Sequence, residues 1–155
     1  MKDILRFLKY FSIFFSISIL FEIWMIYIES EYLKSFLKSN ILTILLAFLA
    51  INTATLGVIA SKIQEIKTKF KDCDFSNTIN EMYFSLKEQV VLLIMNIFVL
   101  VIDDSKLICF SYKCLIVNSL LSSIFFYSIY VLWDTGKAVF VMTTLSNEVN
   151  DNTTT

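Results

Sequence analysis

Histidine and proline are absent from this chain of 155 residues, and glycine occurs only at Gly57 and Gly136. Without histidine, the chain lacks the commonest general base and metal ligand. Without proline and with so little glycine, its helices should run uninterrupted, unlike the broken helices of many transporters. The three cysteines form no C-x-x-C pair, and we interpret Cys73, Cys109 and Cys114 as apolar fillers rather than as metal ligands.

Catalytic signatures are missing as well. The sequence contains no paired-carboxylate motif and no glycine-flanked nucleophile, so we expect no enzymatic activity, no cofactor and no metal. Charge is also scarce, because charged residues make up 17% of the chain against about 25% in soluble domains. The net charge of −1 gives no bulk attraction for nucleic acid, so direct nucleic-acid binding is not expected.

Apolar residues are what the chain has in excess. They make up 57% of the sequence, and the mean hydropathy is +0.71. A soluble domain of this length has about 45–50% apolar residues, and a small fold has too much surface to bury more. The excess predicts that lipid is the principal environment of the chain.

Four apolar runs separate the charged clusters, at about residues 10–28, 39–61, 88–104 and 114–133. A helix that crosses about 30 Å of hydrocarbon needs about 20 residues. The third run is short, and it crosses only if Lys87, Glu88 and Gln89 lie at the interface or face other helices. The first run is expected to be an anchor rather than a cleaved signal peptide, since no A-x-A-like site follows it. The predicted fold class is an all-α integral membrane protein with four transmembrane helices.

The distribution of lysine and arginine predicts the orientation. Nine of these residues fall in the N-terminal tail, the second connection and the C-terminal tail, whereas four fall in the first and third connections. The positive-inside rule therefore predicts that both termini are cytoplasmic.

Residues 62–88 predict a cytoplasmic helical hairpin that prolongs the second and third helices. Apolar residues recur three or four apart on both arms, and Thr78 followed by Glu81 predicts a capping box at the start of the returning arm. Residues 146–155 predict a flexible polar tail. The stripes expected to pack together are Ile63, Ile66 and Phe70 on the first arm with Met82, Tyr83 and Leu86 on the second.

Three lysines, Lys67, Lys69 and Lys71, gather near the tip of this hairpin. Two interpretations remain open. The hairpin is either a solvated connector whose lysines touch anionic headgroups of membrane lipid, or a docking site for an acidic surface of a soluble cytoplasmic partner.

Each apolar run carries one strongly polar residue, namely Glu22, Asn52, Asn96 and Asn118. A charged group at mid-membrane costs about 2.5–3.5 kcal/mol on insertion scales, so Glu22 should face the protein interior or a water-filled path. These residues are either a hydrogen-bonded cluster that holds the helices together or the lining of a pore.

Small residues four apart occur on two faces of the second run. Ala50 and Ala54 form one face, and Thr53, Gly57 and Ser61 form the other. Such residues let helix backbones approach closely. We expect one face to pack within the subunit and the other against a second copy, which predicts a homo-oligomer.

Residues 44–57, ILLAFLAINTATLG, followed by Lys62, resemble the membrane subunit of the Kiwa anti-phage defence system. The resemblance implies a bacterial inner-membrane oligomer that works with a soluble, DNA-binding partner. It also implies that the pair senses phage infection at the envelope and restricts phage DNA replication and transcription.

The sequence is therefore compatible with two functions. The chain is expected to be a sensor and anchor that recruits a soluble cytoplasmic effector. The alternative is a small oligomeric ion channel or a membrane-disrupting effector, with the intramembrane polar residues lining its path.

Overall fold

The computed structural model describes residues 2–69, 74–106 and 112–151, and this part of the chain consists of helices and their connecting turns. The helices are α1 (Lys2–Tyr27), α2 (Tyr32–Lys69), α3 (Ser76–Asp104) and α4 (Lys113–Asp151). Each contains a stretch long and apolar enough to cross a membrane: Ile4–Tyr27, Tyr32–Thr68, Ser76–Asp104 and Lys113–Thr144. The prediction of an all-α chain with four such helices is confirmed.

Two of the helices are much longer than a bilayer is thick. α2 has 38 residues and α4 has 39, so each is about 57 Å long or slightly more. The sequence predicted a flexible tail from residue 146. Instead, the helix α4 continues past the predicted end of the fourth span at residue 133 to Asp151, because no proline interrupts it and Gly136 alone does not end it. Only residues 152–155 of the predicted tail lie outside the described residues.

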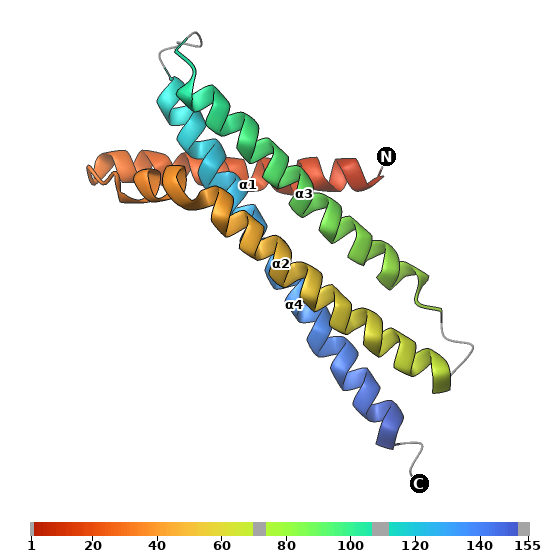
Figure 1. The fold of residues 1–155 in the computed structure, drawn as a ribbon. Coiled ribbons are helices and arrows are strands. Elements are labelled where there is room, and N and C mark those ends of the chain that lie inside the picture. The colour runs from red at the N-terminus through yellow and green to blue at the C-terminus, as the bar shows by residue number, and fades with distance from the viewer. Residues whose placement is uncertain (1, 70–73, 107–111, 152–155) are drawn as a thin grey trace.

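α4 is the central helix. It packs against each of the other three helices, and α2 also packs against α3. Of the most apolar stretch of α4, 56% is buried, against 6% for α1. Figure 1 shows α2, α3 and α4 running alongside one another, while α1 crosses them obliquely.

The turn from α1 to α2 ends the first helix with a left-handed residue. Glu29 has a φ of 53°. The backbone N–H of Glu29 donates to the carbonyl of Ile26, and that of Ser30 donates to Met25, both at 3.1 Å. This is the pattern of a Schellman motif, in which the left-handed position is usually glycine. The chain uses glutamate there instead.

The start of α3 differs from the prediction. The helix begins at Ser76, and no side chain caps it at Phe75, so the capping box predicted from Thr78 and Glu81 is wrong. Asp74 organises this turn instead, accepting hydrogen bonds from the Ser76 hydroxyl at 2.5 Å and from the Ser76 N–H at 2.9 Å. These bonds, the hydroxyl foremost, lower the pKa of the Asp74 carboxyl.

The bundle has two apolar cores. We call residues 2–55, 87–106 and 112–135 the body, and residues 56–69, 74–86 and 136–151 the extension. The core of the body is built from α2, α3 and α4. The core of the extension consists of Leu56, Ile59, Ile63 and Met142.

The extension therefore contains three helices, whereas a hairpin of two was predicted. The residues of α4 beyond the predicted end of its span supply Met142 to the extension core, with Ala138 and Val139 packed beside it. Ile63 and Ile66 are buried as the stripe requires, but Tyr83 is 61% exposed, so its predicted packing is wrong. Phe70 lies outside the described residues.

Candidate functional site: the polar interior of the body and the groove of the extension

The inward faces of the body helices are unusually polar. On α3 the buried residues are Gln89, Leu92, Asn96 and Val99, spaced three, four and three apart. This spacing places them on one face of the helix, so polar and apolar side chains alternate along it. The same spacing on α1 buries Ser18, Glu22 and Met25. The buried polar residues of α4 are Asn118, Ser119, Ser122, Ser123, Ser128 and Thr135.

Glu22 is buried within the bundle, with 8% of its surface exposed. The side-chain amide of Asn118 donates a hydrogen bond of 2.8 Å to its carboxylate. The same amide nitrogen lies 3.5 Å from the sulfur of Cys114. Cys114 is exposed, so its interpretation as a filler of the protein interior is wrong.

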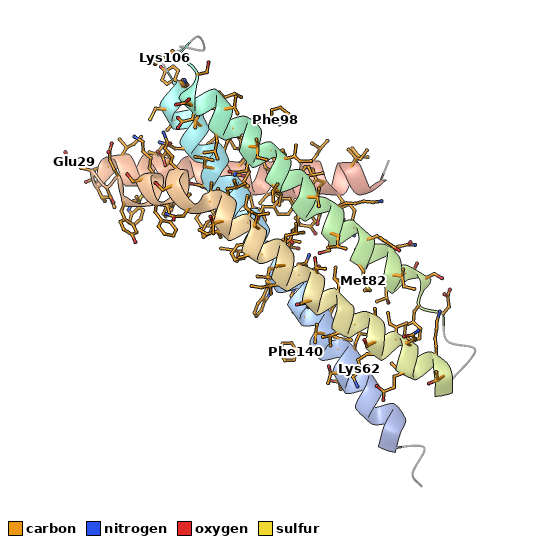
Figure 2. The ribbon with its side chains drawn as sticks, in the orientation of Figure 1. Glu29, Lys62, Met82, Phe98, Lys106 and Phe140 are labelled. Atoms are coloured by element: carbon orange, nitrogen blue, oxygen red, sulfur yellow. The ribbon has the colours of Figure 1, made fainter. Side chains whose placement is uncertain are left out.

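A cavity of about 570 Å³ opens beside this pair. Glu22 and Asn118 line it together with Glu29, Glu31 and Lys34. Lys34 pairs with Glu31 at 3.4 Å. We call this space the outer cavity, since its end of the molecule carries the first and third connections. Figure 2 shows Glu29 and Lys106 at separate corners of that end, both far from Lys62.

Asn52 joins three helices near the opposite end of the body. Its amide donates to the Ser85 hydroxyl at 3.1 Å, and Ser85 lies 2.9 Å from the Thr135 hydroxyl. Thr135 donates its own proton to the carbonyl of Val131 at 3.0 Å, so Ser85 is the donor to Thr135. The chain of bonds links α2, α3 and α4.

Glu88 and Tyr127 form a contact that sequence reasoning missed. The Tyr127 hydroxyl donates to the Glu88 carboxylate at 2.5 Å, and Tyr127 is completely buried. Its ring packs against Phe7 at 5.6 Å and Phe14 at 5.4 Å between centroids. The available signal was the short third run, which crosses only if Glu88 lies at the interface or faces another helix.

Glu88 also lines a second cavity, of about 260 Å³, which we call the inner cavity. Its wall includes both ends of the Ser85–Thr135 bond and the ion pair between Arg6 and Glu81. That pair is bidentate, with N–O distances of 2.9 and 2.6 Å, and the Arg6 guanidinium lies 4.1 Å from the centroid of the Phe84 ring.

Ion pairs mark the two ends of the body. Arg6 pairs with Glu81 at one end, and Lys38 pairs with Asp103 at 2.8 Å at the other. Glu81 and Asp103 are 22 positions apart on α3, which corresponds to about 33 Å along the helix. This distance matches the thickness of a bilayer's hydrocarbon core, about 30 Å.

The four polar residues predicted as one cluster occupy three separate places. Glu22 pairs with Asn118, Asn52 joins the Ser85–Thr135 chain, and Asn96 is isolated and completely buried. Neither atom of the Asn96 amide has a hydrogen-bond partner among the described residues. A single cluster is therefore wrong, because Asn52 lies at the inner end and Asn118 at the outer end.

The small residues of α2 do not pack within the protomer. Ala50, Thr53, Ala54, Gly57 and Ser61 are all exposed, so the expectation that one of their faces packs inside the subunit is wrong. A Cβ atom added at Gly57 would meet nothing within 4 Å. Larger residues form the inward stripe of α2, since its buried positions are Leu37, Ile41, Leu45, Asn52, Leu56, Ile59, Ile63 and Ile66.

An apolar groove of about 590 Å³ lies between α2 and α3 in the extension. Ile63, Met82 and Tyr83 are among its walls, and Lys67 stands at its rim. Of the predicted docking lysines, Lys67 is exposed, whereas Lys71 and the side chain of Lys69 lie outside the described residues.

Among the described residues, no group of three histidine, cysteine, aspartate or glutamate side chains is arranged to hold a metal ion. The site is thus made of a polar interior with a cavity at each end and of an apolar groove beyond the inner cavity. No protein-family model, curated protein or solved structure matches the chain.

Proposed function

We propose that this protein is a bacterial inner-membrane sensor and anchor subunit that recruits a soluble cytoplasmic effector in anti-phage defence. The observation that carries recruitment is the apolar groove on the extension. The defence context rests on the resemblance of residues 44–57 to the Kiwa membrane subunit.

The groove suits an amphipathic helix of a partner protein. Its floor is apolar, and Met82 supplies a flexible, polarizable wall that adapts to different side chains. Lys67 at the rim favours an acidic flank on the partner. The extension core lies directly behind the groove, so the docking surface is held by packed helices rather than by a loop. This combination is typical of helix-in-groove recognition.

The proposed orientation places both termini and the extension in the cytoplasm. The excess of lysine and arginine in the connections on that side supports it. Reporter fusions after Ser35 and Ser105 should report a periplasmic location, and fusions after Asn77 and Asn150 a cytoplasmic one. A cytoplasmic signal after Ser105 would show that α3 does not cross the membrane.

We also propose that the exposed small residues of α2 form the contact between copies of this chain. Gly57→Leu should then reduce the assembled mass measured in mild detergent to that of the protomer. Gly136→Leu is the matched control, because a Cβ atom at either glycine meets nothing within 4 Å inside the protomer. Equal assembly of both variants would rule out this face as the contact.

The recruitment test uses a soluble protein encoded beside this chain, co-expressed and co-purified with it. Tyr83→Asp places a charge in the groove and should reduce co-purification at least about tenfold, by a cost of about 1.4 kcal/mol or more. Phe140→Asp is the matched control, since Phe140 is 76% exposed and Figure 2 shows it on the side of α4 away from α2 and α3. Loss of the partner with Phe140→Asp alone would move the docking site to α4.

The lysines are tested separately by reversing the charge of Lys67, Lys69 and Lys71 together. If they steer an acidic partner, the triple variant should lose co-purification while membrane insertion and assembly stay unchanged. Retained partner binding with altered membrane level would show that they serve lipid attraction instead.

A further inference from the structure

Several buried polar atoms of the body have no hydrogen-bond partner among the described residues. They belong to Ser18, Asn52, Gln89, Asn96, Asn118, Ser119 and Ser123. An unpaired polar group in a protein interior costs about 1–3 kcal/mol, and lipid provides no partner in its place. A bundle this small would not retain so many unpaired groups for packing alone, since apolar residues would fill the same space without the cost.

Three of these residues, Asn118, Ser119 and Ser123, lie on α4, and the buried Ser122 and Tyr127 extend them into a seam. The five residues follow one another along α4 with no step longer than four residues, or about 6 Å of helical rise. One water molecule bonded on both sides bridges about 5.5 Å, so single waters suffice to connect the steps.

The neighbouring helices add polar groups at the same depth. α1 crosses α4 obliquely and in the opposite direction, and α3 runs antiparallel to α4 (Figure 1). The Glu22–Asn118 bond joins α1 to α4, and the buried Ser18 lies one turn before Glu22 on α1. The Tyr127–Glu88 bond fixes the register of α3, so Asn96 lies level with Ser119.

The seam joins the two cavities. Its outer end is Glu22, which lines the outer cavity, and its inner end is Glu88, which lines the inner cavity. Both ends are carboxylates, which take up and release protons.

We propose that each protomer conducts protons along this seam, from Glu22 in the outer cavity to Glu88 in the inner cavity. This activity goes beyond the proposed recruitment of a partner and does not depend on it. A proton bound by Glu22 passes to water and then along the serine hydroxyls, each of which accepts one proton and releases another. At the inner end Tyr127 accepts a proton from the seam as its own hydroxyl proton moves to Glu88, which releases it into the inner cavity. No group is consumed, and the amide of Gln89 only orients the waters.

The test uses the full chain, purified and reconstituted into vesicles of phosphatidylethanolamine and phosphatidylglycerol that contain a pH-sensitive dye. A potassium gradient with valinomycin supplies the driving force, and the rate of internal acidification is measured. We expect a rate above that of empty vesicles and a decrease in D₂O. Glu22→Gln and Glu88→Gln should lower the rate at least about tenfold. Asp104→Asn is the control, because this exposed carboxylate lines neither of the two cavities, and its rate should match that of the unchanged chain.

Tyr127→Phe separates loss of the relay from misfolding, since it removes the hydroxyl and keeps the ring that packs against Phe14. It should lower the rate as much as Glu88→Gln does while the helical content and monodispersity stay unchanged. A rate no higher than that of empty vesicles, or one that all three variants leave unchanged, would overturn the proposal. Equally fast passage of potassium without valinomycin would also overturn it, because it would show a wide pore rather than a proton path.

Discussion

The body and the extension reverse the arrangement familiar from soluble proteins. In the described residues of the body, the buried set includes Glu22, Asn96 and several serines of α4. In those of the extension, every buried side chain is apolar, as at Leu56, Ile59, Ile63, Ile66 and Met142. The body therefore buries polar as well as apolar side chains, whereas the described part of the extension buries apolar ones alone.

The solvent on each side explains this difference. Lipid tails are as apolar as leucine, so helices in a bilayer gain little from burying apolar groups and associate through close packing and hydrogen bonds. Phe98, which is 64% exposed and points away from the bundle in Figure 2, is at no disadvantage in that solvent. In water, by contrast, burial of apolar surface is the main driving force. This difference agrees with the proposal that the body lies in lipid and the extension in water.

The largest effect should follow from placing a polar group in the wrong core. Ile63→Asn buries an unpaired amide and leaves a void in the extension core, which should cost about 3–5 kcal/mol. Hydrogen exchange of residues 56–69 should accelerate while exchange in the body is unchanged. Ala60→Asn, at an exposed position one turn away, is the control and should leave the exchange rates as they are. Faster exchange throughout the chain would show that the two parts unfold together.

Replacing a buried polar side chain of the body with an apolar one should be favourable. Asn96→Leu replaces an unpaired buried amide with an apolar side chain of similar size, and we expect the body to be stabilised by about 1 kcal/mol. Unfolding in mixed micelles with increasing SDS gives the measurement. Destabilisation would mean that the Asn96 amide has a hydrogen-bond partner outside the protein.

An interaction of intermediate strength is expected between Glu22 on α1 and Asn118 on α4. A double-mutant cycle with Glu22→Ala and Asn118→Ala is expected to give a coupling free energy of about 0.6–1.7 kcal/mol, in the range of other interhelical bonds in membranes. The same cycle between Glu22→Ala and Ser128→Ala should give no coupling, because Ser128 donates to Ile124 within its own helix. Coupling in both cycles would indicate a general change of packing.

The smallest effect is expected where the body meets the extension. The side chains of Arg6 and Glu81 are 40% and 62% exposed, so Glu81→Gln should cost at most about 1 kcal/mol, and added salt should reduce that cost. Thermal unfolding at two salt concentrations measures it. A cost several times larger and independent of salt would show that this pair, rather than apolar packing, holds α1 in place.

The sequence was sufficient to predict the four helices and the burial of Glu22, because both follow from the cost of exposing charge and backbone to lipid. It did not predict the central position of α4, since neither the length nor the hydropathy of the fourth run sets it apart from the others. The predicted capping box failed because α3 begins at Ser76, two residues before Thr78, and Glu81 bonds instead to Arg6, 75 positions away. The small residues of α2 were predicted to contact other helices. Within the protomer they contact none, because larger residues occupy the inward face of α2.

The central position of α4 has a consequence for how the protein is made. α1 packs mainly on α4. The first helix to be synthesised therefore has no main packing partner until the fourth helix has been made. At about 5–20 residues per second, a ribosome needs about 5–19 s to make the 96 residues from Glu22 to Asn118. During that interval Glu22 has entered the bilayer without Asn118, its hydrogen-bond partner in the finished bundle. A chain stopped before α4 therefore leaves a membrane helix with an unpaired carboxylate, a ready signal for quality-control proteases.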